Sequence, residues 1–189
     1  MTKVAVWCRH KGDDIIGFGS RIPWDVPSDK ALFAALVKNQ NVVMGRRTYE
    51  SLPGRTLPDC QILVLTSDYK YKVSDKDNHA TVENIRDFSE FEEDLYIAGG
   101  AKVYEAFMCS GSKLMPDIVV DCIYAGELNP AVKGEKISIT ACIDVLKKKY
   151  FKAAETDAVD NVVRAVYIKR GDFVDQAVLK SILNIVEKK

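Results

Sequence analysis

The chain has 189 residues, of which 47% are hydrophobic and 29% are charged, as is usual for a globular domain with a sizeable core. Lys and Arg together number 27, and so do Asp and Glu, which makes the formal net charge zero. This balance gives no sign of binding to nucleic acid or to an anionic membrane, although it leaves room for a local basic site for one small anion.

The cysteine and histidine content argues against a zinc site and against a disulfide framework. The five cysteines form no CxxC pair, their number is odd, and the chain has two histidines. The apolar run at the N-terminus is too short for a signal peptide, and no stretch approaches the length of a membrane span. We therefore expect a reduced, cytoplasmic protein that holds no metal.

Short apolar runs rich in β-branched residues predict strands at 4–8, 42–44, 62–66, 95–98, 118–123 and 162–169. Helical patterns between them predict helices over 28–37, 46–52, 84–93 and 101–108. This alternation of strands and helices favours an α/β fold with a largely parallel sheet.

The last stretch, residues 172–189, has the pattern of an amphipathic helix of about four turns. Its apolar side carries Val174, Val178, Ile182, Ile185 and Val186. We favour packing of this helix on its own domain, and contact with a partner or a second copy is the alternative.

The segment IGFGSRIPWDVPSD, residues 16–29, combines a loop punctuated by Gly and Pro with the start of a helix. Trp24 lies between the two prolines, and Asp29 falls in the first helical turn. One interpretation of Asp29 is a solvated acid that interacts favourably with the helix dipole. However, Asp29 and Phe33 are four residues apart and share a helix face, which predicts a partly buried carboxylate. Burial raises the pKa of a carboxyl group and suits it to bind or protonate a basic heterocycle.

The segment VVMGRRTYESLPGRTLP, residues 42–58, runs from a strand through Gly45 into a helix that opens with Arg46, Arg47 and Thr48. A helix N-terminus presents free backbone N–H groups, and arginine adds forked donors that match phosphate. An exposed basic turn is the alternative interpretation. We favour phosphate binding because the glycine follows a buried strand.

The segment LYIAGGAKVYEAF, residues 95–107, again runs from a strand through glycines, here Gly99 and Gly100, into a helix. The G-x-G-x-x-G fingerprint of a Rossmann site is absent, and a single Gly-Gly pair is also compatible with a tight turn. Two strand-to-helix anion sites in one small sheet nevertheless favour an extended ligand with several phosphates, such as a dinucleotide.

Together these segments closely resemble those of dihydrofolate reductases. The matching pieces are IGFGSRIPW, VPSDKALF, VVMGRRTYESLPGRTLP, LVLTS and IAGGAKVYEAF, in the order and spacing of the family, over about residues 3–170. The resemblance implies an α/β domain over 1–170 with a twisted, mostly parallel eight-stranded sheet, an antiparallel final strand and flanking helices. An extra helical extension over 171–189 would follow it.

The resemblance also implies an activity, which is NADPH-dependent reduction of 7,8-dihydrofolate to 5,6,7,8-tetrahydrofolate. Hydride would pass to C6 of the pterin while N5 gains a proton. Asp29 would be the catalytic acid, binding the amidine edge of the pterin and helping to protonate N5 through a water that Trp24 orients. The residues implied at the substrate are Val6 and Ala98 through their carbonyls, together with Cys8, Phe33, Leu52, Arg55, Leu57, Tyr104 and Asp121.

On the cofactor side, the resemblance implies that Cys8, Ile16 and Gly17 border the nicotinamide of NADPH. The family's cis Gly-Gly pair would correspond to Gly99 and Gly100. The phosphates would be held by Arg46, Arg47, Thr48, Thr66 and Ser67. Further cofactor contacts are expected from Gly45, Leu65, Ala101, Lys102, Val103 and Tyr104.

Two departures from the family pattern concern charged contacts. Cys60 stands where the family has an arginine for the α-carboxylate of the substrate's glutamate tail, a loss that Arg55 could partly offset. Asp121 aligns with the threonine that hydrogen-bonds the catalytic acid. Two facing carboxylates would raise one apparent pKa and move the rate-versus-pH profile to higher pH. A register error of one residue would instead turn Asp121 outward.

Other departures keep further interpretations open. Lys30 replaces a usually apolar residue and could pair with Asp121 or reach the substrate's tail, and the family's Gly-Asp-Thr segment appears only as Gly134-Glu135-Lys136. The alternatives are a reductase of the same fold for another pterin or a pyrimidine intermediate, and a non-catalytic scaffold. The joint presence of Trp24, Asp29 and Phe33 favours a pterin. We expect dihydrofolate and antifolate inhibitors as ligands, no nucleic acid or membrane partner, and a monomer, with a dimer through the terminal helix as the alternative.

Overall fold

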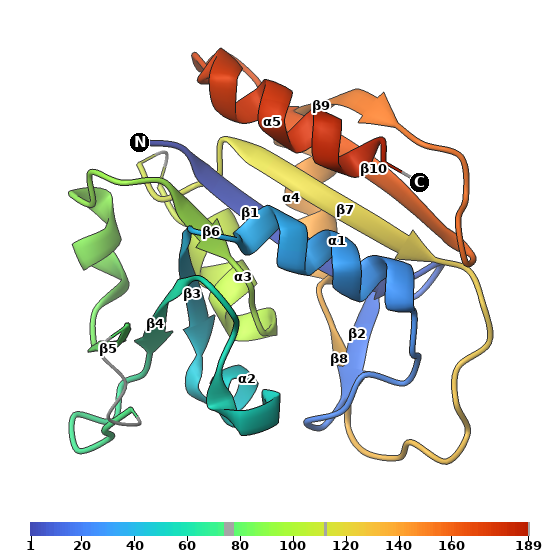
Figure 1. Cartoon of the computed structure of the whole chain (residues 1–189), viewed down its shortest axis with the longest axis horizontal. Helices are drawn as coiled ribbons and strands as arrows, with labels where there is room; N and C mark the ends of the chain where they lie inside the picture. Colours follow the sequence, from blue (N-terminus) through green and yellow to red (C-terminus); the bar gives the residue numbers. More distant parts are fainter. Residues whose placement is uncertain (74–77, 112, 189) are drawn as a thin grey trace.

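The computed structural model describes residues 1–73, 78–111 and 113–188. A twisted sheet of eight strands runs through the molecule, with helices on both faces (Figure 1). In chain order its strands are β1 (Lys3–His10), β3 (Asn41–Gly45), β4 (Gln61–Leu65), β5 (His79–Val82), β6 (Leu95–Ile97), β7 (Ile118–Tyr124), β9 (Tyr150–Glu155) and β10 (Val162–Lys169).

The spatial order of the strands is β5-β4-β3-β6-β1-β7-β10-β9. From β5 to β7 all neighbours are parallel, whereas β10 is antiparallel to both β7 and β9. This topology confirms the expected α/β fold, the mostly parallel sheet and the antiparallel final strand.

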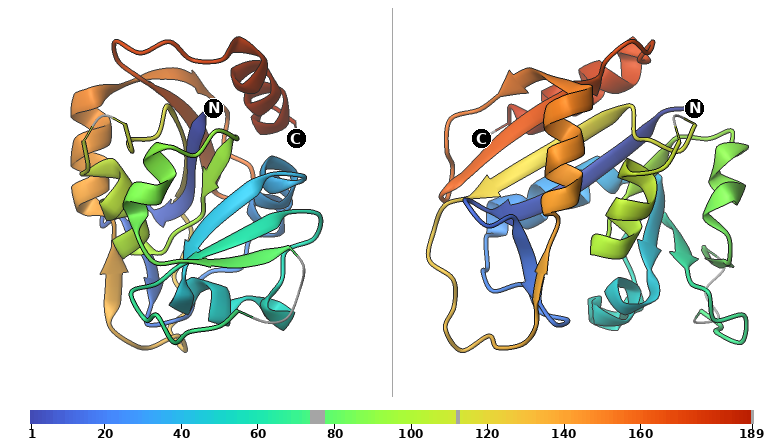
Figure 2. Two further views of the ribbon diagram at one scale, coloured as in Figure 1. Left: turned by 90° about the vertical axis from the view of Figure 1, so that its left-hand side faces the viewer. Right: turned by 180° about the vertical axis from the view of Figure 1, so that it is seen from behind.

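The helices divide between the two faces of the sheet. Their bounds are α1 (Pro27–Val37), α2 (Arg46–Ser51), α3 (Ala101–Met108), α4 (Thr140–Lys149) and α5 (Gln176–Val186), with 3-10 helices η1 (Pro53–Arg55) and η2 (Ile85–Ser89). The two views of Figure 2 show α3 and α4 on the face opposite to α1 and α5. A separate two-stranded sheet pairs β2 (Ile15–Phe18) with β8 (Lys136–Ser138).

The core has two halves because both faces of the sheet are covered, which is why the strands read as nearly continuous apolar runs. On β1, Val4 and Val6 pack on the side of α1 and α5, whereas Ala5 and Trp7 pack on the side of α3 and α4. The same alternation along β7 and β10 decides which of their side chains can reach a given site.

The terminal helix α5 packs on its own domain, as we favoured, and contacts α1. Ile182 and Val186 are 0% and 1% exposed within the same half of the core as α1. The helix is shorter than the predicted 172–189, because the side chain of Asp175 caps it by accepting hydrogen bonds from the amides of Ala177 and Val178. Among the described helices, none is long and apolar enough to cross a membrane.

The prediction of a helix over 84–93 is wrong, since this stretch forms only the 3-10 helix η2. The sequence patterns also missed β2, β5, β8, β9 and α4.

Candidate active site

The carboxyl ends of three adjacent parallel strands, β4, β3 and β6, bring the expected cofactor residues together. Gly45 at the end of β3 is in register with Leu65 at the end of β4, and its amide donates to the Gly99 carbonyl at 2.7 Å. Because parallel strands end at the same edge of a sheet, segments far apart in sequence meet here. This arrangement agrees with one continuous cofactor site along that edge.

Gly99 and Gly100 allow unusually close packing at the start of α3. Their peptide bond is cis, and Gly99 has a φ of +93°. A Cβ on Gly99 would come within 2.6 Å of the Tyr104 ring, and one on Gly100 within 3.3 Å of the Thr48 hydroxyl. Ala101 and Lys102 begin the helix, where backbone N–H groups have no partner within the helix.

Basic and hydroxyl side chains gather beside these glycines. The Arg46 guanidinium donates to Asp68 at 2.9 Å and lies 5.4 Å from the centre of the Tyr71 ring. Thr66 accepts from the Asp68 amide at 3.2 Å, so Arg46 and Thr66 belong to one polar group. The side chains that remain exposed here are those of Arg47, Ser67 and Lys102, while Thr48 is half-buried and Val103 is buried.

Asp29 lies in the first turn of α1 and is half-buried. Cys8 on β1 and Cys122 on β7 are in register, and both thiols lie close enough to its carboxylate to act on its pKa as hydrogen-bond donors. Burial raises the pKa of Asp29, and the thiol hydrogen bonds and the positive charge of Arg164 oppose this increase. Burial, together with the neighbouring Asp29, also raises the pKa of Cys8, so this thiol stays protonated and can act as a donor.

An apolar wall adjoins the acid. Its members are partly buried and pack against the half of the core that lies between the sheet and α1: Cys8, Trp24, Phe33, Leu52, Leu57 and Ala98. These residues thus lie in the same half of the core, which is compatible with an apolar slot for a pterin.

The loop that carries Trp24 is tied down at several points. The Trp24 ring stacks on Tyr124 with centroids 5.3 Å apart, and the Pro23 carbonyl accepts from the Asn129 amide at 2.7 Å. Tyr124 was not among the predicted site residues, although an aromatic residue at the end of a predicted strand beside β1 was a signal for it.

Gly17 and Ile16 lie on β2, at the entrance to the same loop. Gly17 is buried, and a Cβ there would come within 2.9 Å of the Arg21 carbonyl. Ile16 packs against the half of the core below α3 and α4.

Tyr104 connects the cofactor and substrate sides. Its hydroxyl donates to the Val6 carbonyl at 2.6 Å, and its ring is 5% exposed. The Val6 carbonyl therefore has a fixed orientation at the point where the two sides meet.

The prediction that Asp121 faces the catalytic acid is wrong. The alternative of a one-residue shift is correct in placing Asp121 on the other face of the sheet, but its carboxylate is buried there and is not turned outward. Asp121 is paired with Trp7 on β1, so it points to the opposite face, and Cys122 takes the position beside Asp29. Asp121 is completely buried, accepts from the Trp7 indole at 2.8 Å, and binds both Nε and Nη2 of Arg9 at 2.9 Å. Asp121 is thus not a substrate-binding residue.

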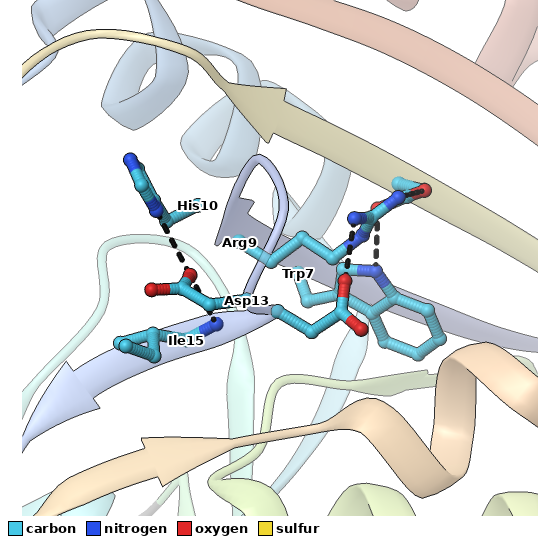
Figure 3. A network of polar contacts seen from close by, with 7 residues as sticks. Trp7, Arg9, His10, Asp13 and Ile15 are labelled. Carbon is cyan, nitrogen blue, oxygen red and sulfur yellow. Dashed lines mark hydrogen bonds and ion pairs between the residues drawn. The ribbon is translucent and has the colours of Figure 1, made fainter.

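Figure 3 shows the indole of Trp7 and the guanidinium of Arg9 close together, and both donate to the Asp121 carboxylate. Arg9 also donates to Asp14 at 2.7 Å, and Asp13 lies between the His10 ring and the Ile15 amide. The network therefore ties the end of β1 to the turn that leads into β2.

The other departures from the family pattern have local explanations. Lys30 pairs with Asp25 at 2.7 Å, which is neither of the partners considered. The Cys60 side chain is buried, with its thiol 3.6 Å from the Leu57 carbonyl, whereas Arg55 is exposed at the end of η1. In the segment 134–136, the Glu135 carbonyl accepts from the Gly19 amide at 2.9 Å and joins β8 to the loop after β2.

Comparison with known proteins agrees with this geometry. Residues 4–159 match the family model for dihydrofolate reductase. The dihydrofolate reductase of Enterococcus faecium is 28% identical over 126 residues, which are 66% of this chain and 74% of that protein. That of Neisseria meningitidis serogroup A is 35% identical over 89 residues, which are 47% of this chain, and the match spans about half of the relative, 55% of its length.

A solved structure of dihydrofolate reductase from Enterococcus faecalis, complexed with NADP(H) and RAB-propyl, has a TM-score of 0.71 at 18% identity. It covers 89% of this chain and 96% of that one, and at this identity the likeness establishes the fold. Because the family model spans most of its length, the chain belongs to the dihydrofolate reductase family.

Proposed function

We propose that this protein reduces 7,8-dihydrofolate to 5,6,7,8-tetrahydrofolate with NADPH. The observation that carries the proposal is the placement of Asp29, a half-buried acid on α1 with a raised pKa that adjoins an apolar wall. The cofactor residues lie on the same sheet, at the carboxyl ends of β4, β3 and β6.

The residues at those strand ends fit a dinucleotide. Arg46 and Arg47 supply forked donors for phosphate, and Thr48, Thr66 and Ser67 supply hydroxyl groups. The close packing at Gly99 requires a residue without a Cβ, and Gly100 leaves little room for one. When bound there, NADPH supplies the hydride from C4 of its nicotinamide ring. Arg46 would exchange its contact with Asp68 for one with a phosphate.

Asp29 accepts hydrogen bonds from the amidine edge of the pterin in this proposal. Its raised pKa keeps a proton available closer to neutral pH, and that proton reaches N5 through a water beside Trp24. Protonation at N5 makes C6 a better hydride acceptor. The surrounding wall of Phe33, Leu52 and Leu57 excludes other water and aligns the ring.

The test is NADPH oxidation with dihydrofolate by the wild type, an Asp29→Asn variant and an Asp25→Asn control. Asp25 is a matched control because it lies four residues away but is exposed and paired with Lys30. We expect turnover to fall about 10²-fold or more in Asp29→Asn, the effect typical of losing a general acid, and to stay within about twofold in the control.

Full activity of Asp29→Asn would contradict the role of the acid. A folded wild type that binds NADPH but does not oxidise it with dihydrofolate or a tail-less dihydropterin would reject the function. In that case a pyrimidine substrate or a non-catalytic scaffold would become the better interpretation.

We further infer that the protein is a cytoplasmic monomer that binds antifolates through Asp29. The apolar side of α5 is occupied by its own core, and the five cysteines are free thiols, as a reducing compartment favours. Light scattering over a concentration series tests the monomer, and a mass that rises to that of a dimer would contradict it.

A further inference from the structure

Arg164 on β10 is a buried cation whose hydrogen bonds go to backbone carbonyls. It is 5% exposed, and its Nη1 donates to the carbonyls of Val186 at 3.3 Å and Lys188 at 3.0 Å. Its Nη2 donates to the carbonyl of Ser28 at 3.2 Å. Nε has no hydrogen-bond partner among the described residues. Among the described residues, Arg164 therefore has backbone carbonyls as its hydrogen-bond partners and forms no ion pair with a carboxylate.

The position of Arg164 relates it to the catalytic acid. In register, Arg164 on β10 pairs with Cys122 on β7, which pairs with Cys8 on β1. These three residues therefore form one row across the sheet, on the face that α1 covers, and all three act on the pKa of Asp29. The Ser28 carbonyl that Arg164 binds belongs to the residue directly before Asp29.

The terminal helix holds the guanidinium in place. Two of the three acceptors are carbonyls at the C-terminal end of α5, where the helix dipole favours a positive charge. Burial of Ile182 and Val186 fixes that end against the sheet. The C-terminal end of α5 thus lies beside the start of α1 (Figure 1). Helix α5 lies beyond residues 4–159, which the family model matches.

We propose that Arg164 is a positioning residue for Asp29, and that the C-terminal end of α5 orients it. The guanidinium holds the Ser28 carbonyl and thereby fixes the first turn of α1 and its acid. Its charge also favours the ionised form of Asp29. The kinetic consequences rest on the proposed reductase function, whereas the titration of Asp29 is a property of the free protein.

Several titratable groups besides Arg164 act at the acid. They are Cys8 on β1, Cys122 on β7 and Tyr104 on α3, and burial raises the pKa of each. The ion pair of Lys30 and Asp25 lies nearby but is exposed on both sides. Among these groups Arg164 supplies the buried positive charge.

The first measurement is the titration of Asp29 by carbon-13 NMR of labelled aspartate carboxyl groups, without ligands, with Asp29→Asn to assign the signal. Arg164→Gln removes the charge and keeps amide donors, so we expect the pKa of Asp29 to rise. Arg164→Lys keeps a charge, so we expect a titration close to that of the wild type. Lys30→Met removes an exposed cation next to Asp29 in sequence and serves as the control that should leave the titration unchanged.

The second measurement is the single-turnover rate with saturating NADPH and dihydrofolate, over a range of pH. Neither Gln nor Lys can hold three carbonyls with the geometry of a guanidinium. We therefore expect the single-turnover rate of both variants to be about tenfold lower. A displacement of a reacting group by about 1 Å can lower a rate roughly 10²-fold, and we expect Asp29 to move by less. Only Arg164→Gln should also move the decline of the rate to higher pH.

The proposal would be overturned if Asp29 titrates in folded Arg164→Gln as it does in the wild type, and if Arg164→Gln and Arg164→Lys both keep the wild-type single-turnover rate. If Arg164→Gln does not fold, Arg164→Lys and a deletion of residues 187–189 decide the question. The deletion removes the Lys188 carbonyl, keeps the buried α5 side chains and places the terminal carboxylate on Val186. We expect a slower single turnover, because an ion pair with that carboxylate draws the guanidinium away from the Ser28 carbonyl. Wild-type rates in both Arg164→Lys and the deletion variant would contradict the positioning role of Arg164. Absence of turnover in the wild type would instead reject the reductase function.

Discussion

At Asp29, the burial that serves proton transfer also lowers the free energy of unfolding. The pKa of this acid is raised in the folded state above its ordinary value of 3.8. The folded protein therefore binds this proton more tightly than the unfolded chain does, and stability falls as the pH rises from 3.8 through the folded pKa. We expect Asp29→Asn to raise the Tm by a few degrees at neutral pH, because the amide removes the cost of burying a charge.

Thermal unfolding of both proteins over a range of pH checks this expectation. The difference in Tm should shrink towards acid pH, where the wild-type carboxyl is also neutral. An Asp29→Asn variant that is less stable than the wild type at neutral pH would show that the charge is well paired, contrary to our description.

Arg55 and Cys60 lead to a prediction about the tail of the substrate. Cys60 is buried, so a positive charge at that position would have no access to solvent, whereas Arg55 is exposed near Leu57. We expect Arg55→Ala to raise KM for dihydrofolate about tenfold, as for loss of a hydrogen bond to a charged group. KM for a tail-less dihydropterin should not change.

Lys38→Ala is the control, since Lys38 is an exposed cation beside Asp59. Equal changes for both substrates in Arg55→Ala would mean that this residue does not contact the tail.

At the scale of elements, the network of Arg9, Trp7 and Asp121 joins β1, β7 and the turn into β2. Arg9→Met would leave the Asp121 carboxylate buried, with the indole as its one remaining side-chain donor among the described residues. Loss of one partner of a buried ion pair typically costs about 3–5 kcal/mol. We expect a destabilisation of that order in urea unfolding.

The double variant Arg9→Met/Asp121→Asn should regain part of the lost stability, because the buried charge is gone. A double variant no more stable than Arg9→Met would show that the charge is not the source of the loss.

The elements that the sequence predicted correctly are those buried on both faces. The parallel strands β1, β3, β4, β6 and β7 have long apolar runs, and α1 and α3 begin at clear Pro or Gly signals. The missed strands carry weaker signals: β5 and β9 lie at the edges of the sheet, and β8 is largely exposed. In the segment 84–93, Phe88 is the buried residue of η2, too little apolar surface to sustain a helix.

At the scale of the whole molecule, the site arises where strand ends and helix starts from separate segments meet. The motifs supply most of the residues that we propose for it, because glycines, arginines and the acid on α1 each have a local reason for their place. The side of the sheet on which Asp121 lies could not be predicted, because it depends on a register difference of one residue between β1 and β7. The contact of Arg164 with α1 and α5 joins residues 136 and 22 positions apart and leaves no local pattern.

The proposed reaction requires that hydride leaves NADPH and arrives at C6 of the pterin. The most direct test is a reaction of the wild type with dihydrofolate and NADPH deuterated at C4 of the nicotinamide, with mass spectrometry and NMR of the product. We predict tetrahydrofolate with one deuterium at C6, and a strongly reduced yield in Asp29→Asn. Oxidation of the labelled cofactor without deuterium in the pterin, or no reaction by folded protein, would contradict the central claim.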